Sequence, residues 1–243
     1  MQTESRHSAA GSAIWKAQLP GRPLSGLTVL VVEDSRFASE AIRLLCLRSG
    51  ARIRRADCIL AAKRHLQTYR PTVVLVDMGL PDGSGADLIR RITTHGEHAP
   101  LVLGISGNPD LRDDALAAGA VGFIAKPINS LAVFQQIILS ALPTGAPMPG
   151  PRPVPNEVVT PDISALHDDL AHAAQILSIA ANGDAIDYIA HFLTGVARSA
   201  QDAPLAAAAT ALAQDHEAGR AVARNLSRIG DMVHQRLATV GHA

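Results

Sequence analysis

The feature that most constrains the fold is a regular alternation of short β-branched runs with amphipathic segments. The runs are LTVLVV (27–32), RIRRA (52–56), VVLV (73–76), LVLGI (101–105) and GFIA (122–125). Segments with helical spacing of apolar residues follow them, at about 36–48, 58–68, 84–94, 110–118 and 129–142. Five strands alternating with five helices predict a doubly wound α/β fold, with a five-stranded parallel sheet covered on both faces.

A proline-rich segment divides the chain. Seven of the fifteen prolines lie between Pro143 and Pro161, and no regular element tolerates that density. The sequence therefore predicts an extended linker there. We expect four parts, namely a flexible N-terminal tail, an α/β domain, the linker and a C-terminal domain, over residues 1–25, 26–142, 143–161 and 162–243.

After the linker the sequence has helical spacing only. Helices are predicted at about 162–181, 184–199, 203–214 and 217–239. Asn182 and Gly183 separate the first two, and Asp202 is a predicted N-cap of the third. Four such helices predict a small all-α four-helix bundle.

Composition excludes several classes of function. Residues 162–243 contain nine acidic residues, five arginines and no lysine, the wrong balance for a nucleic-acid-binding domain. No apolar run approaches the ~18–20 residues that span a bilayer, and no glycine-rich nucleotide loop marks a kinase ATP site. Cys46 and Cys58 have no metal or disulfide spacing, so we expect a reduced, cytoplasmic setting.

Polar residues follow four of the predicted strands. Glu33 and Asp34 follow the first strand, Asp77 the third, Ser106 the fourth and Lys126 the fifth. Each alone has an ordinary explanation, as a helix cap, a turn residue or a loop residue. Because ligands of open parallel sheets bind beyond the carboxyl ends of the strands, the set together predicts one site.

The chemistry of these residues is that of phosphoryl transfer. Three neighbouring carboxylates repel one another, so a bare cluster would hold protons or recruit a cation. All-oxygen ligands suit Mg²⁺, which neutralises a transferring phosphoryl group. Asp77 ends a buried strand and is the expected nucleophile that forms an aspartyl phosphate. Lys126 and Ser106 can bind phosphoryl oxygens.

The N-terminal half resembles a response-regulator receiver domain. The resemblance covers residues 27–142 and is carried by VVEDS (31–35), LVDMGLPDGSG (75–85), GISG (104–107) and FIAKP (123–127). It implies that Asp77 accepts a phosphoryl group from a sensor histidine kinase, and that Lys126 pairs with the phosphate.

The resemblance also implies roles for the surrounding residues. Glu33 and Asp34 would hold Mg²⁺, with the backbone carbonyl of Gly79 as a further ligand. Ser106 would be the switch hydroxyl, and Phe123 stands at the switch-aromatic position, where ordinary core packing is an equally compatible role. The family often has a cis Lys-Pro bond, here Lys126–Pro127.

His191 is the second candidate site residue. A buried stripe with helical spacing lies opposite it, formed by Ile186, Ile189, Leu193 and Val196. The imidazole is therefore expected to face solvent or a partner. Gly195, one turn later, leaves the ring uncovered, and Arg198 is placed to attract a phosphoryl group. A neutral, exposed imidazole can carry a phosphoryl group near pH 7.

The C-terminal segment resembles a histidine phosphotransfer (HPt) domain. The resemblance is carried by AHFLTGVARSA (190–200) with PLAAAATAL (204–212) after it. It implies that His191 accepts and donates a phosphoryl group, with Gly195 as the accommodating small residue. Thr194 departs from the family's usual lysine, and Gln201 from a common glycine.

Two hypotheses follow. In the first, the protein is a phosphorelay response regulator that exchanges a phosphoryl group through His191 with Asp77 or with another receiver domain. In the second, phosphorylation switches a helical domain that only dimerises or binds a partner, and His191 is an ordinary surface residue. His167 is a weaker candidate for the phosphoryl-carrying histidine, because an acid follows it near a helix start.

Overall fold

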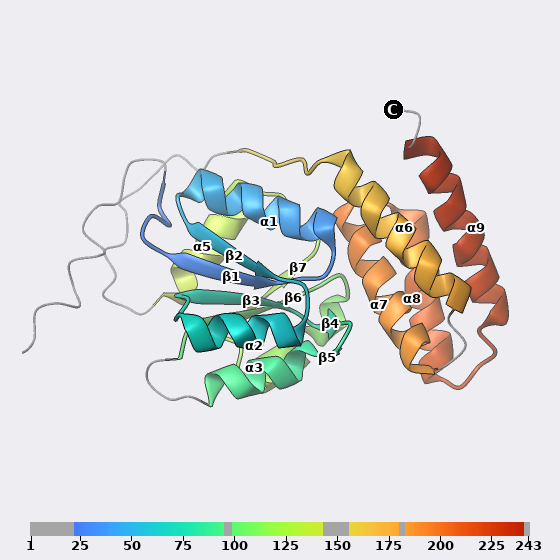
Figure 1. Cartoon of the computed structure of the whole chain (residues 1–243), viewed down its shortest axis with the longest axis horizontal. Helices are drawn as coiled ribbons and strands as arrows, with labels where there is room; N and C mark the ends of the chain where they lie inside the picture. Colours follow the sequence, from blue (N-terminus) through green and yellow to red (C-terminus); the bar gives the residue numbers. More distant parts are fainter. Residues whose placement is uncertain (1–21, 95–98, 143–155, 180–182, 241–243) are drawn as a thin grey trace, which may run out of the picture.

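The computed structural model describes residues 22–94, 99–142, 156–179 and 183–240. Its main sheet has five strands in the order β2-β1-β3-β6-β7, and every neighbouring pair is parallel. The strands are β1 (Thr28–Val32), β2 (Arg52–Ala56), β3 (Val73–Asp77), β6 (Leu101–Ser106) and β7 (Gly122–Ala125). This confirms the predicted doubly wound parallel sheet (Figure 1).

Helices cover both faces of the sheet. On one face, α1 (Arg36–Ser49) and α5 (Leu131–Ala141) pack against the sheet and form the first apolar core. On the other face, α2 (Ile59–Thr68), α3 (Gly85–Thr93) and α4 (Arg112–Ala117) form the second. Successive residues of β1 point to opposite faces. Val29 and Val31 therefore join the first core and Leu30 and Val32 the second, which explains why the strand is apolar throughout.

A short hairpin was not among the predicted elements. Strands β4 (Gly79–Leu80) and β5 (Gly83–Ser84) pair antiparallel between β3 and α3. Strands of two residues are too short for alternation of polar and apolar residues to show. The hairpin is close to the site, because it begins two residues after Asp77.

The ends of the predicted tail and linker pack against the α/β region (residues 22–142). Leu24 is fully buried, and its N–H donates to the Ser49 carbonyl. Val159 is 2% exposed and lies in the same core. Its N–H donates to the Asn129 carbonyl. The rest of the predicted tail and linker, 1–21 and 143–155, lies outside the described residues.

The chain after the linker is helical, as predicted. We call residues 163–240 the helical region; it contains α6 (Ile163–Ile179), α7 (Gly183–Ser199), α8 (Ala203–Glu217) and α9 (Ala223–Val240). Helix α9 begins at Ala223 and not near residue 217, because Gly219 has φ +65° and ends α8. The four helices share one apolar core. Within the described ranges, no helix is long and apolar enough to cross a membrane.

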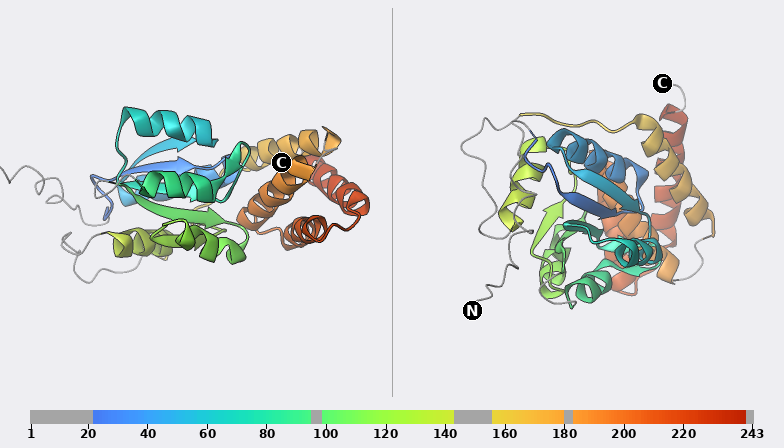
Figure 2. Two further views of the ribbon diagram at one scale, coloured as in Figure 1. Left: turned by 90° about the horizontal axis from the view of Figure 1, so that it is seen from below. Right: turned by 60° about the vertical axis from the view of Figure 1, so that its left-hand side comes forward.

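The helical region lies beyond the carboxyl ends of the strands, as Figure 1 and the left view of Figure 2 show. Helices α6 and α7 contact α1, and α7 also contacts β4. The carboxyl-end edge of the sheet, where the sequence predicts a site, is therefore covered by part of the same chain.

Asp169 on α6 joins the two regions. Its carboxylate accepts hydrogen bonds from the Ser35 hydroxyl (2.7 Å), the Arg36 N–H (2.8 Å) and the Phe37 N–H (3.0 Å). These amides begin α1, where backbone N–H groups have no partner within the helix, and a negative charge there is favourable. Asp169, 2% exposed, thus completes the N-terminus of α1 from another part of the chain.

Replacing Asp169 is expected to weaken this contact. Asp169→Ala leaves two amide donors and a hydroxyl without their acceptor, so the free energy of unfolding should fall by about 1–3 kcal/mol. Urea unfolding measures that loss, and hydrogen exchange should quicken at the Arg36 and Phe37 amides. Asp168→Ala is the matched control. It removes only an exposed ion pair with Arg36, which contributes ~0–1 kcal/mol. Equal losses in the two variants would contradict the assignment.

Candidate functional site

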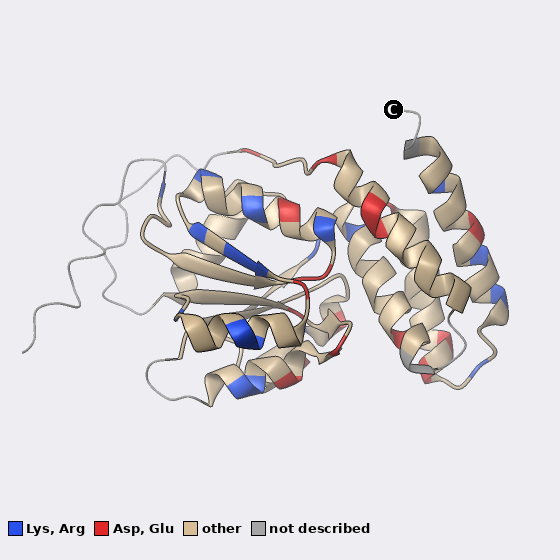
Figure 3. Cartoon of the chain, viewed as in Figure 1, with Lys and Arg blue, Asp and Glu red and all other residues tan. Residues whose placement is uncertain are grey.

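Three carboxylates meet at the carboxyl ends of β1 and β3. Glu33 and Asp34 follow β1 and Asp77 ends β3, and one oxygen from each lies within 4.8 Å of the others. Glu33 and Asp77 are buried, at 3% and 7% exposed. Figure 3 shows acidic segments at this edge of the sheet, facing the helical region. The geometry brings together the three acids that the sequence singled out.

Lys126 lies among these carboxylates. It follows β7, and its Nζ is 2.8 Å from Glu33 Oε2 and 3.3 Å from Asp77 Oδ1. Burial lowers the pKa of Lys126, but the attraction of Asp77 and Glu33 outweighs burial and raises it above the usual range. The Lys126–Pro127 peptide bond is cis, which confirms that prediction.

One lysine does not compensate the charge of three acids, of which Glu33 and Asp77 are buried and Asp34 is half-buried. Burial, reinforced by repulsion from Asp77, raises the pKa of Glu33 to about 8. Burial and repulsion from Glu33 raise the pKa of Asp34 to about 7. Burial raises the pKa of Asp77 to about 6, although Lys126 pulls it down. The site therefore holds protons at neutral pH or takes up a cation.

The donor set fits a hard divalent cation. All three side chains offer oxygen, which is the ligand atom that Mg²⁺ prefers. Among the described residues, Asp34 Oδ1 is buried and has no hydrogen-bond partner, so one acceptor of the cluster is free to bind a cation. Gly79, whose carbonyl the family resemblance adds as a ligand, lies in β4 close by.

Ser106 and Phe123 stand at neighbouring strands. Ser106 ends β6, is 5% exposed, and its Oγ accepts a hydrogen bond from the Asn108 N–H (3.0 Å). Phe123 in β7 is half-buried and packs against the core beneath α2, α3 and α4. Core packing is thus the role of Phe123 that the contacts show.

His191 lies at the same edge, on α7. A methyl group added at Gly79 would be 3.0 Å from His191 Cβ, so the histidine packs directly on β4. The opposite stripe of α7 is buried in the core of the helical region, as predicted. Its His191 face meets the α/β region of the same chain. The imidazole Nδ1 is 2.9 Å from the Asp187 carbonyl oxygen.

Glycines on both sides make this contact close. A methyl group at Gly195 would be 3.0 Å from Lys126 Nζ. One at Gly107 would be 2.9 Å from the Thr194 carbonyl oxygen and 3.0 Å from Gly195 Cα. Gly195 therefore admits the lysine of the acidic site, where the sequence predicted only clearance for an incoming partner.

Two other residues of α7 differ from expectation. Thr194 is 6% exposed, and its hydroxyl donates to the Ala190 carbonyl (2.7 Å). Arg198, predicted to attract a phosphoryl group, is exposed in the last turn of the helix. Within the described part of the chain, no hydrogen bond or ion pair joins Arg198 to the acidic site. On α6, hydrogen bonds to the α/β region come from Asp168 and Asp169, beside His167.

Sequence reasoning missed three residues that build the site. Tyr188 donates a 2.7 Å hydrogen bond from its hydroxyl to Asp34 Oδ2, Asp169 completes the start of α1, and Gly107 receives α7. Tyr188 shares the helix face of His191, which is the one signal available in the sequence. Asp169 and Gly107 become recognisable only when the two regions are seen in contact.

Comparison with known proteins identifies the α/β region. A family model described as "Response regulator receiver domain" matches residues 29–138. The response regulator protein PilR of Pseudomonas aeruginosa is 28% identical over 155 residues, which are 63% of this chain and 35% of PilR. The transcriptional regulatory protein CitB of Klebsiella pneumoniae is 28% identical over 44% of this chain and 47% of CitB. The chain thus spans less than half of these relatives.

Solved structures match the same half of the chain. A response regulator described as putative, from Chloroflexus aurantiacus, is 26% identical over 47% of this chain and 98% of its own, with a TM-score of 0.43. The receiver domain of a Pseudomonas aeruginosa sensor histidine kinase, solved with a magnesium ion coordinated in its active-site cleft, is 24% identical over 47% of this chain and 95% of its own, with a TM-score of 0.43. On the family match and the sequence relatives, residues 29–138 of this chain are a response-regulator receiver domain.

Proposed function

We propose that this protein is a phosphorelay response regulator in which Asp77 and His191 exchange a phosphoryl group within one chain. The packing of the His191 face onto the edge of the sheet that bears Asp77 carries the proposal. His191 contacts Gly79, two residues after Asp77, and Gly195 contacts Lys126, whose Nζ is 3.3 Å from Asp77. Packing that close favours transfer by proximity.

The proposal treats the helical region as an HPt-like four-helix bundle. Helix α6 contacts α7 and α9, and α8 contacts the same two helices, so each helix has two neighbours. Antiparallel bundles with short connections have this arrangement. The bundle presents His191 outward from its core, which is what a phosphoryl carrier needs.

The chemistry of the first step uses the buried cluster. The Asp77 carboxylate attacks the phosphohistidine of a sensor kinase, forming the acyl-phosphate bond as the bond to the kinase nitrogen breaks. In this proposal Lys126 and Ser106 bind the phosphoryl oxygens. A magnesium ion held by Glu33, Asp34 and Asp77 would neutralise charge on the phosphoryl group.

The second step uses the free nitrogen of His191. A carbonyl only accepts hydrogen bonds, so the contact with the Asp187 carbonyl places the proton of the neutral ring on Nδ1. The lone pair is then on Nε2. Nε2 forms the bond to phosphorus while the bond to the Asp77 oxygen breaks, and the carboxylate leaves with the electron pair.

A second function is favoured by Thr194. The family's usual lysine is replaced there by a buried hydroxyl bonded within its own helix, so no cation beside His191 assists transfer from that position. In this alternative, phosphorylation of Asp77 releases the helical region to bind a partner or a second copy, and His191 carries no phosphoryl group.

Transfer between the two residues can be measured by their chemical stability. When the full chain is incubated with a phosphorylated sensor kinase, we expect base-stable, acid-labile label in wild type and none in Asp77→Asn. His191→Gln should retain only the acyl-phosphate label, because its nucleophile is gone. Base-stable label that persists in His191→Gln would contradict the relay through His191 and leave the second function.

A mixing experiment tests transfer within one chain. When Asp77→Asn and His191→Gln proteins are combined with the kinase, intrachain transfer predicts at least ~10-fold less histidine label than wild type gives, because no single chain has both residues. Label restored by mixing would show exchange between chains.

Gly107→Ala should lower histidine label and leave aspartyl label intact, because a methyl group there meets the α7 backbone.

Stability should depend on pH and on magnesium. The folded pKa values of the three acids lie above the ~4 of unfolded Asp and Glu. The folded state therefore binds more protons, and its stability falls as pH rises from about 4 to 8. Thermal unfolding without divalent cations should show a midpoint lower by several degrees at pH 8 than at pH 5.

Magnesium should oppose this loss, because it binds the deprotonated carboxylates. We expect the stabilisation by added Mg²⁺ to be larger at pH 8 than at pH 6, and Asp34→Asn to reduce both the pH effect and the magnesium effect. If pH and Mg²⁺ shift the unfolding midpoint of wild type no more than that of Asp34→Asn, the carboxylate cluster is not the source of these shifts.

A further inference from the structure

The two oxygens of the Asp34 carboxylate face different partners. Oδ2 accepts the hydrogen bond from the Tyr188 hydroxyl at 2.7 Å. Oδ1 is buried without a hydrogen-bond partner in the described part of the chain, and Asp34 lies within the carboxylate cluster with Glu33 and Asp77. One member of the carboxylate cluster is thus held by a side chain of the helical region.

Aromatic packing holds Tyr188 in place. Its ring centroid is 5.8 Å from that of Phe192, which is 3% exposed. Phe192 in turn meets the His172 ring edge-on, with 5.4 Å between centroids. Three rings from α6 and α7 therefore fix the position from which the hydroxyl donates.

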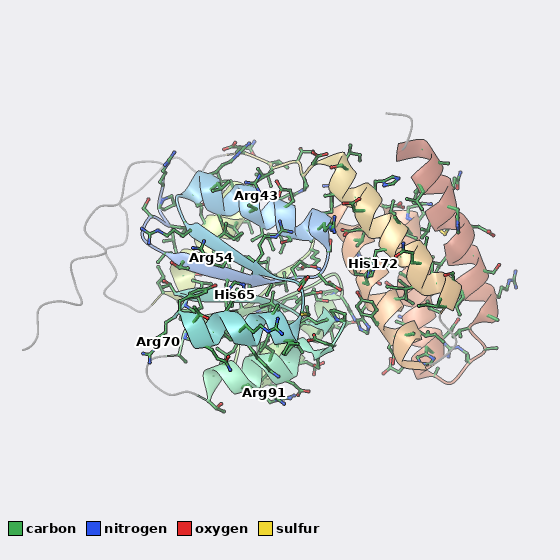
Figure 4. All side chains as sticks on the ribbon, in the orientation of Figure 1. Arg43, Arg54, His65, Arg70, Arg91 and His172 are labelled. Carbon is green, nitrogen blue, oxygen red and sulfur yellow. The ribbon has the colours of Figure 1, made fainter. Side chains whose placement is uncertain are left out.

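Asp34 also lines a cavity between the two regions. A cavity of about 510 Å³ lies between them and is lined by Asp34, Asp57, Asp168, Asp169 and Tyr188, among others. His172, labelled in Figure 4, also lines it from α6. Arg36, which pairs with Asp168, lines it too. The four carboxylates of the lining outnumber this one arginine, and that balance favours cations in the cavity beside Asp34.

We propose that Tyr188 is a positioning residue of the cation site, holding Asp34 by Oδ2 so that Oδ1 is presented to the ion. Hydrogen bonds to ligating carboxylates orient them in this way, and their loss typically weakens metal binding 10–100-fold. The inference rests on the proposed cation site and is independent of transfer to His191. Because coupling between two binding events is reciprocal, Mg²⁺ in turn strengthens the contact between the two regions.

The test uses the only two tyrosines of the chain. Calorimetric titration of the full chain with MgCl₂ should give a dissociation constant at least ~10-fold higher for Tyr188→Phe than for wild type. Tyr69→Phe is the matched control. Unlike the Tyr188 hydroxyl, the buried Tyr69 hydroxyl has no hydrogen-bond partner among the described residues. Tyr69 lies at the end of α2, before β3 begins, and loss of its hydroxyl should leave the affinity unchanged.

Hydrogen exchange at the Arg36 and Phe37 amides separates positioning from simple loss of contact, since both donate to Asp169. We expect these amides to stay protected in Tyr188→Phe, and to exchange more slowly in wild type when Mg²⁺ is added. Weaker Mg²⁺ binding together with lost protection would make Tyr188 a docking residue only and overturn the proposal.

Equal magnesium affinity in Tyr188→Phe and wild type would also overturn it, while leaving the relay intact. Absence of Mg²⁺ binding in wild type would overturn the cation site itself. The titration is repeated in a His191→Gln background, where an unchanged effect of Tyr188→Phe shows that the inference stands whether or not His191 carries a phosphoryl group.

Discussion

The structure depends on three neighbouring carboxylates, two of them buried and one half-buried, that share a single lysine. Glu33, Asp34 and Asp77 are held at the end of the sheet with only Lys126 to offset them. Burial disfavours each charge, and the rigid parallel strands prevent the acids from separating. This unbalanced charge raises the pKa values of the three acids, so the site holds protons at neutral pH or takes up a cation.

The helical region contacts this edge of the sheet through small residues and hydrogen bonds. In the part of the chain that the structure describes, no ion pair joins its basic side chains to the three acids. Gly107 lets the α7 backbone come close to the end of β6, and Gly79 and Gly195 admit the side chains of His191 and Lys126. Tyr188 and Asp169 bond to the segment that follows β1. Gly195 lies inside α7, where glycine costs roughly 1 kcal/mol relative to alanine, and the close approach of Lys126 gives this glycine a structural reason. Residues of both regions are thus suited to the contact between the α/β region and the helical region.

Most of the α/β region could be predicted because its signals are local. Alternation of strands and helices determines a parallel sheet, and a parallel sheet places Asp77 and Lys126 at one edge without any knowledge of distances. The apolar stripe on the opposite side of the helix likewise predicted which way His191 points, because that signal is also local. The surface that it meets could not be predicted, because the partners of Gly195 and Asp169 are ~70 and ~130 residues away in the chain and no periodicity records them.

The anchored end of the linker limits how this molecule can open. Val159 is fixed in the core of the α/β region, and α6 begins at Ile163. Four residue steps of extended chain reach at most about 14 Å. The start of α6 therefore remains within about 14 Å of Val159 as long as Val159 stays packed in the core of the α/β region. Any exchange of His191 with an outside protein must then occur by pivoting about residues 160–162, which keeps the local concentration of the two regions high throughout.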